Sequence, residues 1–375
     1  MSDTKFITVF SPYLPPSPLA VSERMRHFIE VLEDNGYTVN VLSGKLAHWG
    51  KSLWLDLPSS RTGFFMTLFR ETLSGIELAI RMALMKEPCA LLTSPPLITT
   101  FLGAWGAHMT KKYYFLDVRD LYPNLYFQTG RFKKNSPLGT IFSKMEAWLY
   151  THSAVIFTSS QRICDDIQAR YPSTNGRVFN IWNGYDEENF IHHDEKPDTF
   201  KILYHGNFGP MNNISLLRKV AQDLHAAQVP VQIDCAGVGP GAALIKGANL
   251  ENLKVIPPFK PEELSMRISS YHLVLSLRSD GLIGETDFPA KVFESVGAGV
   301  PVIVTPKCEA GTYLMDAKAG LQFANNDGGQ VVDAIKTFAA NPGMLQQMHE
   351  AMSKVREALG RRSLRQALVE VLNQL

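Results

Sequence analysis

The stretch that decides the fold runs from residue 288 to residue 303 and reads FPAKVFESVGAGVPVI. It predicts a helix that ends in a Gly-x-Gly turn and passes into a β-branched strand. Glu294 lies early in that helix, where the helix dipole favours a carboxylate and backbone N–H groups can bind phosphate. A nucleotide could therefore place its phosphates at the helix start and its ribose hydroxyls on Glu294. The alternative is an ordinary helix-to-strand turn with a solvated glutamate.

The strand-helix pattern continues along the whole chain outside this unit. Alternation of strands and helices indicates parallel sheets, and 375 residues are too many for one typical core. We therefore predict an α/β fold with two Rossmann-like, doubly wound domains. Helical patterns include 22–35, 215–227 and 262–270. β-Branched runs predict strands at 5–10, 38–42, 89–93, 113–118, 154–158, 178–181, 201–205, 231–236, 253–256, 272–276 and 301–304.

A charged run that contains proline separates the two halves of the chain. The predicted domains are residues 1–191 and 201–375, with residues 192–200 as the linker. The last helix can cross back to the N-terminal domain.

Composition argues against several classes of protein. The net charge of +1 does not suit a general nucleic-acid-binding protein. The four cysteines are far apart in the sequence, which fits buried thiols in a reducing compartment better than disulfides or a zinc site. No secretory signal is recognisable, because residues 1–10 resemble the start of a first strand. No transmembrane helix is recognisable either, because charges interrupt the longest apolar region, residues 63–86. These features predict a cytoplasmic protein.

Doubly wound sheets bind ligands at the carboxyl ends of their strands, so the loops after the strands are the candidate sites. In the first half, Asp117, Arg119 and Asp120 follow the predicted strand 113–118. Buried charge without a partner is costly, which favours a functional role at this position. Arg119 could bind a phosphate or carboxylate, while Asp117 or Asp120 orients it or accepts a substrate proton. The alternative is a structural Arg–Asp pair.

In the second half, Gly206 and Asn207 follow the strand 201–205, where small residues permit close approach of a ligand. The segment 235–242 imitates a dinucleotide-binding turn, but Pro240 removes a backbone donor, so we reject an NAD site. Gly237 and Gly239 could still border a nucleotide base. Two cations near the predicted helix, Arg278 and Lys291, could neutralise a diphosphate.

Several of these motifs resemble one known family. The run Phe288-Pro289-x-Lys291-x-x-Glu294, followed by Ala-Gly-x-Pro-Val-Ile, is similar to the donor-site signature of GT-B glycosyltransferases of family 4. Segments 117–123, 159–160, 183–190 and 206–209 fall in the order of comparable stretches of that family. The resemblance is strongest to the bacterial surface-polysaccharide branch, which includes O-antigen and capsule enzymes.

The resemblance implies a GT-B fold, in which two Rossmann-like domains face a central cleft. The C-terminal domain would bind a nucleotide-sugar donor and the N-terminal domain an acceptor. Transfer would be independent of metals and other cofactors and would retain the configuration of the anomeric carbon. Glu294 would bind the ribose hydroxyls, and the backbone around Phe288 and Pro289 would hold phosphate or the donor sugar.

Three positions depart from the family pattern. Thr286 stands where a sugar-binding glutamate is usual, so Glu285 or Asp287 would have to supply that carboxylate. Asn207 and Asn212 stand where many members carry the arginine and lysine that bind diphosphate, which leaves Arg278 and Lys291 for that role. A histidine common after an N-domain strand is replaced by Arg119.

Residues 63–86 predict an amphipathic helix with charges opposite one apolar face. The members of that face are Phe65, Leu68, Phe69, Ile76, Ile80 and Ala83. Our first interpretation is a helix packed on the sheet. The alternative is attachment to an anionic membrane surface through Trp49, Trp54, Phe64, Phe65 and the basic cluster Arg131, Lys133 and Lys134.

Together, these features predict a retaining hexosyl- or N-acetylhexosaminyl-transferase that uses a UDP- or GDP-sugar. Its acceptor would be a glycan or a polyprenyl-diphosphate-linked molecule, at the inner face of the cell membrane in the second case. Two alternatives remain open. One is a nucleotide-sugar epimerase of GT-B fold, and the other is a nucleotide-binding scaffold subunit without catalysis.

Overall fold

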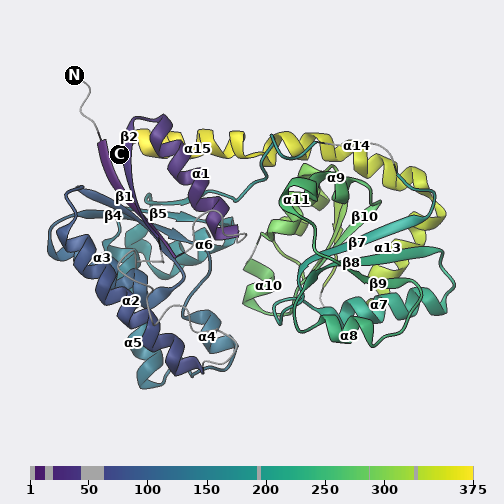
Figure 1. The fold of residues 1–375 in the computed structure, drawn as a ribbon, viewed down its shortest axis with the longest axis horizontal. Helices are drawn as coiled ribbons and strands as arrows, with labels where there is room; N and C mark the ends of the chain where they lie inside the picture. The colour runs from purple at the N-terminus through teal and green to yellow at the C-terminus, as the bar shows by residue number, and fades with distance from the viewer. Residues whose placement is uncertain are drawn as a thin grey trace. The chain divides into compact units, whose positions relative to one another are not determined.

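The computed structural model describes residues 5–12, 20–43, 63–191, 196–286, 288–324 and 328–374 (Figure 1). The chain divides into two compact units, Met1–Ile181 with Ala367–Leu375, and Trp182–Gln366. The division falls ten residues before the end of the predicted N-terminal domain, and the end of the last helix belongs to the first unit. Within the described residues, no helix is long and apolar enough to span a membrane.

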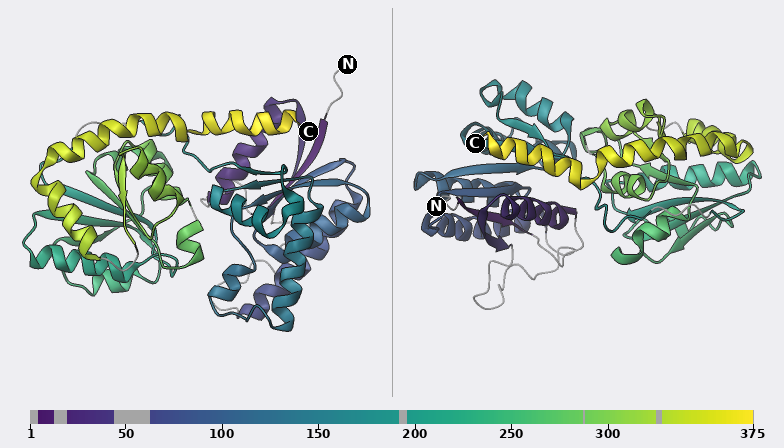
Figure 2. Two further views of the ribbon diagram at one scale, coloured as in Figure 1. Left: turned by 180° about the vertical axis from the view of Figure 1, so that it is seen from behind. Right: turned by 90° about the horizontal axis from the view of Figure 1, so that it is seen from above.

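The first unit is built on a six-stranded parallel sheet in the order β2-β1-β3-β4-β5-β6. Its strands are β1 (Lys5–Ser11), β2 (Tyr37–Ser43), β3 (Cys89–Ser94), β4 (Tyr113–Val118), β5 (Val155–Thr158) and β6 (Val178–Asn180). Its helices are α1 (Ala20–Asp34), α2 (Phe64–Leu84), α3 (Leu97–Met109), α4 (Asn124–Gln128), α5 (Pro137–His152) and α6 (Gln161–Arg170). They lie on both sides of the sheet (Figure 2).

One core of the first unit combines residues from both ends of the chain. Met25 and Phe28 of α1 pack with Ile7 and Val9 of β1, and Leu368 from the end of α15 (Arg361–Asn373) joins them. The last helix is thus part of the first unit's hydrophobic core.

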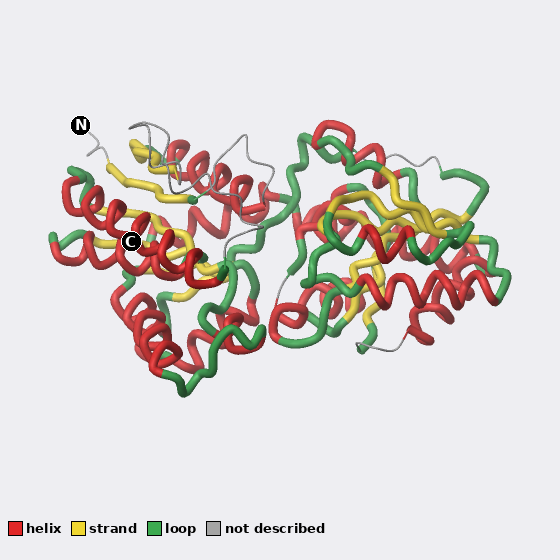
Figure 3. The backbone as a smooth tube through the Cα atoms, turned by 60° about the horizontal axis from the view of Figure 1, so that its bottom comes forward, coloured by secondary structure: helices red, strands yellow, loops and turns green. Residues whose placement is uncertain are grey.

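The second unit contains another parallel sheet, whose strands are yellow among red helices in Figure 3. It has six strands, in the order β12-β11-β10-β7-β8-β9. Its strands are β7 (Phe200–Asn207), β8 (Val231–Val238), β9 (Leu253–Ile256), β10 (Leu273–Leu277), β11 (Val302–Thr305) and β12 (Gly320–Gln322). Its helices are α7 (Ile214–Ala226), α8 (Ala242–Lys246), α9 (Leu264–Ser269), α10 (Leu282–Thr286), α11 (Ala290–Gly297), α12 (Glu309–Asp316), α13 (Gly328–Ala340) and α14 (Pro342–Leu359).

Successive side chains along each strand point to opposite faces of this sheet, and each face has its own hydrophobic core. Tyr204 of β7 packs with the core formed by α7, α8 and α13, whereas its neighbour Leu203 packs with that formed by α9, α11, α12 and α14. Ile303 and Val304 of β11 divide in the same way. Strands that are buried on both faces read as continuous apolar runs, as these do.

The predicted α/β fold with two doubly wound parallel sheets is confirmed. All eleven predicted strands are present to within two residues at either end. The short edge strand β12 escaped prediction, because three residues around Gly320 carry too little β-branched character to stand out.

Candidate nucleotide-binding site

Polar residues of the second unit lie together at the side of its sheet where the carboxyl ends of β7, β8 and β10 meet. His205, Gly206 and Asn207 end β7, and Arg278 directly follows β10. The helix α11 begins one residue after Pro289 and carries Lys291 in its first turn. Parallel strands all end at this side of the sheet, so the fold brings together residues that lie far apart in the sequence, such as His205 and Glu294, which are 89 positions apart.

Lys291 is almost buried, with 8% of its surface exposed. Its ammonium nitrogen lies 4.5 Å from the centre of the Tyr204 ring, a cation–π arrangement. The same nitrogen donates to Asn212 Oδ1 over 3.2 Å. Two fixed contacts therefore hold a desolvated positive charge at the end of β7.

Arg278 reaches the same asparagine through the backbone. Arg278 and Asn212 form an isolated antiparallel bridge, and the Arg278 N–H donates to the Thr305 carbonyl over 2.8 Å. Its side chain is 9% exposed. Burial raises the pKa of Tyr204, and the nearby Arg278 charge opposes that effect. The Lys291 ammonium group and the Arg278 backbone thus both contact Asn212, and the Arg278 charge acts on Tyr204. Two cationic residues therefore come together here, as a site for a diphosphate requires.

The two asparagines at the positions of the family's usual cations contact each other. Asn212 Nδ2 donates to the Asn207 carbonyl over 2.7 Å, while Asn212 Oδ1 accepts from Lys291. Asn212 therefore orients the lysine. A positive charge nevertheless lies beside these asparagines, on Lys291 of α11.

Glu294 lies beside His205, with its Oε2 atom 3.4 Å from His205 Nδ1. Burial lowers the pKa of His205 to about 3, helped by the Lys291 charge, so its ring is neutral. Burial raises the pKa of the Glu294 carboxyl to about 7, against the opposing charges of Lys291 and Arg361. The Glu294 side chain keeps 30% of its surface exposed, enough to meet a ligand.

One expectation for Glu294 is wrong. The sequence suggested an acidic residue at a helix start, but α11 has none in its first turn, and Glu294 is the fifth of its eight residues. The helix dipole therefore does not favour its carboxylate, and the carboxyl holds its proton to a higher pH than usual.

Among the described residues, the buried polar atoms of this cluster that make no hydrogen bond include His205 Nε2 and Tyr204 Oη. Unsatisfied buried groups are uncommon in proteins. Neither residue was singled out as a site residue from the sequence. The signal that could have found them was their position at the end of a strand, directly before Gly206.

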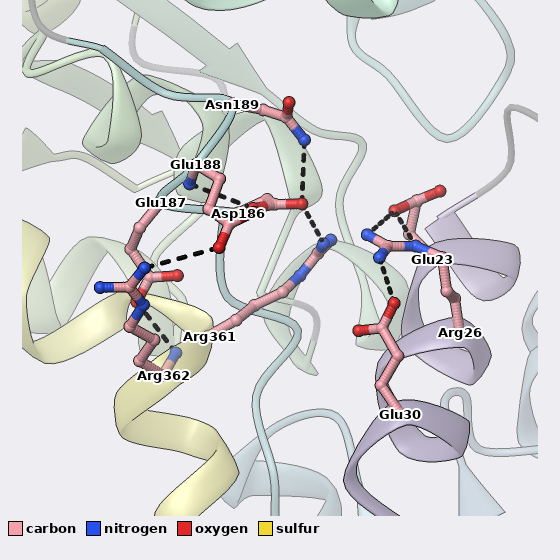
Figure 4. Close-up of polar contacts among 9 residues, drawn as sticks. All are labelled: Glu23, Arg26, Glu30, Asp186, Glu187, Glu188, Asn189, Arg361 and Arg362. Atoms are coloured by element: carbon pink, nitrogen blue, oxygen red, sulfur yellow. Dashed lines mark hydrogen bonds and ion pairs between the residues drawn. The ribbon is translucent and has the colours of Figure 1, made fainter. Parts of the chain in front are cut away.

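The charge near Glu294 from Arg361 is fixed by a second network (Figure 4). Arg361 Nη1 lies 3.5 Å from Asp186 Oδ2, and Asp186 also accepts from Asn189 Nδ2 over 2.9 Å. The Arg362 N–H donates to Glu187 Oε1 over 2.9 Å. The start of α15 is therefore tied to residues 186–189, part of a segment that resembles the family.

The glycines of this edge have a structural explanation. A side chain at Gly237 would place its Cβ 1.9 Å from the Gly206 carbonyl oxygen, and one at Gly239 would lie 2.9 Å from the Phe208 backbone. Gly239 also has a φ of +140°, which other residues rarely adopt. Contact between the ends of β7 and β8 thus accounts for both, without a nucleotide base.

The remaining predicted donor-site residues lie between β10 and α11. Phe288 is buried and stacks on Phe293 with ring centres 4.2 Å apart. Pro289 directly precedes α11. Thr286 is buried and Glu285 partly buried in the short helix α10. Asp287 lies outside the described residues. Contacts of these residues with a donor stay predictions.

In the first unit, the structure gives Asp117 a different partner from the expected Arg119. Asp117 is fully buried and forms an ion pair with Arg24 of α1, Nη2 to Oδ1 2.7 Å, and its Oδ2 accepts from Thr93 over 2.9 Å. Arg24 also donates to the Ile181 carbonyl over 2.5 Å. The Arg24–Asp117 pair therefore holds α1 against the ends of the strands. No local sequence signal predicted this structural role.

Arg119 lies in the same loop and shares the contact with Thr93, but within the described residues its contacts include no direct ion pair with Asp117. It donates to Thr93 Oγ1 over 3.1 Å and to the Pro95 carbonyl over 2.8 Å. Burial lowers its pKa, and Asp120 and Asp117 oppose that effect. Asp120 is partly buried beside it. Catalytic roles for Asp117, Arg119 and Asp120 stay predictions, and buried Asp117 is the least accessible of them.

Fold and site together define an α/β protein of the GT-B type, with cations and a carboxyl group at a strand edge suited to a nucleoside diphosphate. Residues 186–355 match the family described as Glycosyl transferases group 1, which supports glycosyl transfer. No curated protein matches the sequence. The described residues contain no group of three or more His, Cys, Asp or Glu side chains arranged to hold a metal ion.

Solved glycosyltransferase structures share the fold over nearly the whole chain. Sucrose-phosphate synthase from Thermosynechococcus elongatus is 15% identical, with a TM-score of 0.77 and 99% and 98% of the two chains covered. Anabaena Alr3699/HepE, in complex with UDP and glucose, is 13% identical, with a TM-score of 0.67 and coverage of 99% and 100%. WaaG, a glycosyltransferase involved in lipopolysaccharide biosynthesis, is 12% identical, with a TM-score of 0.67 and coverage of 97% and 99%.

Proposed function

We propose that this protein is a retaining glycosyltransferase of family 4 that transfers a hexosyl or N-acetylhexosaminyl group from a UDP- or GDP-sugar. The observation that carries the proposal is that Lys291, through its ammonium group, and Arg278, through its backbone, both contact Asn212 near the ends of β7 and β10. Two nearly buried cations suit the two phosphates of a leaving nucleoside diphosphate. The family match over residues 186–355 and the UDP found in Alr3699/HepE support the same donor class.

In the proposed reaction, the acceptor oxygen approaches the anomeric carbon from the side on which the diphosphate leaves. The bond from that carbon to the diphosphate oxygen breaks, and the bond to the acceptor oxygen forms with retained configuration. The acceptor proton passes to the departing diphosphate. Lys291, Arg278 and the backbone N–H groups at the start of α11 stabilise the charge that develops on this leaving group. The two side chains supply this charge, so we propose that no metal or other cofactor takes part.

Glu294 would hold the nucleotide by accepting hydrogen bonds from the ribose hydroxyls in its ionised form. His205 lies beside the Glu294 carboxylate and fixes its position. We assign the acceptor to the first unit, near Arg119 and Asp120. A glycan or polyprenyl-diphosphate-linked acceptor in bacterial surface-polysaccharide synthesis fits the sequence resemblance, and the role of WaaG supports it. We place the reaction in the cytoplasm, in contact with the inner face of the membrane.

Two measurements test the proposal. Calorimetry with UDP, GDP and CMP should show binding of a nucleoside diphosphate, and an absence of any binding would favour a scaffold subunit. Incubation with nucleotide sugars should release the diphosphate in the presence of an acceptor and leave the sugar configuration unchanged in its absence. Epimerised nucleotide sugar in that second sample would identify an epimerase.

A further inference from the structure

Helix α2 exposes the face that its sequence pattern had assigned to the core. Along one side it carries an apolar stripe of Phe65 (77% exposed), Leu73 (36%), Ile76 (48%), Ile80 (55%) and Leu84 (77%). At 100° per residue these positions fall within about 100° of the helix circumference, and they extend over about 29 Å. Every exposed residue of α2 except Thr67 is apolar.

The opposite side of α2 is fixed against α3, and the predicted packing on the sheet is wrong. Gly75, Leu78 and Met82 are the buried residues of α2. A Cβ at Gly106 of α3 would lie 2.3 Å from the Ala79 carbonyl oxygen, and one at Gly103 would lie 2.5 Å from Leu78 Cδ2. Such close contact sets the rotation of α2, so the apolar stripe cannot turn inward without loss of this packing.

Basic residues flank both ends of the apolar stripe. At its start, the Arg131 guanidinium lies 5.9 Å from the centre of the Phe64 ring, and Lys133 and Lys134 follow in an exposed loop. Residues 121–145 contain no Asp or Glu. At its end, Lys112 donates to the Met82 and Met85 carbonyls over 3.0 and 2.6 Å, and Lys86 and Lys111 are exposed.

This charge pattern distinguishes two possible occupants of the stripe. If a second copy of the chain paired its α2 with this one, basic ends would meet basic ends in both the parallel and the antiparallel arrangement. An anionic lipid surface attracts both ends at once while its acyl region accepts the apolar side chains. We propose that the apolar stripe of α2 is a docking surface for an anionic membrane. The inference deepens the membrane contact of the proposed function and is independent of the transfer chemistry.

The test is co-sedimentation of the full chain with vesicles of phosphatidylcholine alone and of equal parts phosphatidylcholine and phosphatidylglycerol. We expect binding to the anionic vesicles and at least about tenfold weaker binding for Ile76→Ser/Ile80→Ser, which removes apolar contact. Lys133→Glu/Lys134→Glu should lower that affinity by about tenfold or more, because each basic residue near an anionic surface contributes. The matched controls are Met266→Ser for exposed apolar surface and Lys246→Glu/Lys254→Glu for charge.

Absence of binding to anionic vesicles would overturn the proposal, and so would equal losses in the control variants. A wild-type dimer that Ile76→Ser/Ile80→Ser converts to a monomer in sedimentation velocity, without vesicle binding, would show an interface between copies and also overturn it. Calorimetry with UDP and GDP on the same variants keeps the two proposals apart. Unchanged nucleotide binding with lost vesicle binding in the α2 variant supports the docking surface. Unchanged vesicle binding in that variant overturns the docking surface and leaves the proposed function standing.

Discussion

Lys291→Met isolates the role of the buried cation, because methionine keeps the length of the side chain and removes its charge. The ammonium group donates to Asn212 and lies over the Tyr204 ring. A hydrogen bond to a charged group contributes about 1.5–3 kcal/mol, so the variant should bind a nucleoside diphosphate about tenfold to a hundredfold more weakly. Uridine and guanosine carry no phosphate, so their affinity should not change.

Stability should change little in the same variant. The lost cation–π contact, worth about 0.5–2 kcal/mol, is offset by relief of the desolvation of a buried charge and by a sulfur–aromatic contact of about 0.3–1.5 kcal/mol. The assay is calorimetry with UDP, GDP and the two nucleosides, beside thermal unfolding, with the exposed Lys254→Met as control. Equal losses for diphosphate and nucleoside would refute the reasoning, because they would place Lys291 away from the phosphates.

Three further predictions concern other parts of the site and the core. Glu294 should release its proton near pH 7, so nucleotide affinity should fall as the pH drops through about 7, and Glu294→Gln should bind weakly without that pH dependence. The raised pKa favours the protonated folded state, so the same variant should melt higher than wild type above pH 7 and equally below about 4.5; a lower melting temperature above pH 7 contradicts the assignment. Asp117→Asn should destabilise the protein by about 3–5 kcal/mol in urea unfolding, because it leaves Arg24 buried without its counter-charge, and a loss below about 1 kcal/mol would argue against a buried pair. Gly237→Ala should lower the melting temperature, because the new Cβ would clash with the backbone of the neighbouring strand β7. The control Gly343→Ala, whose Cβ meets nothing, should stabilise its helix by about 1 kcal/mol. Equal melting temperatures of the two variants would show that the ends of β7 and β8 can separate.

The sequence predicted the sheets well because their strands are apolar on both faces and therefore stand out as β-branched runs. It also singled out Arg278 and Lys291, since Arg278 follows a predicted strand and Lys291 lies in the predicted helix, and their contact with a diphosphate stays a prediction. It could not show that Asn212 joins them, because that contact depends on how the loop after β7 meets the end of β10. The partner of Asp117 was equally hidden, since Arg24 is 93 residues away and no pattern within α1 indicates it.

The pKa of Glu294 shows a different limit of sequence reasoning. The helix dipole stabilises a carboxylate in the first turn of a helix. It does not stabilise the Glu294 carboxylate, which lies further along α11 and beside the buried His205. Burial of Glu294, together with its place beyond the first turn of α11, therefore reverses the expected direction of its pKa shift. Helix boundaries are the least certain part of a sequence prediction. The proposed ribose contact is consequently a pH-sensitive one.

Helix α2 shows why amphipathicity alone does not identify a buried face. Its sequence contains two apolar sides, a wide one with Phe65, Ile76 and Ile80, and a narrow one with Leu78 and Met82. Periodicity favours the wider side for the core, but close helix packing depends on small residues that let two backbones approach. Gly75 on α2 and Gly103 and Gly106 on α3 supply that surface, on the narrow side. Because these glycines hold the narrow side against α3, the wide apolar side remains at the surface. Exposure of this apolar side to water is unfavourable for the isolated protein, and a partner that buries it explains its presence.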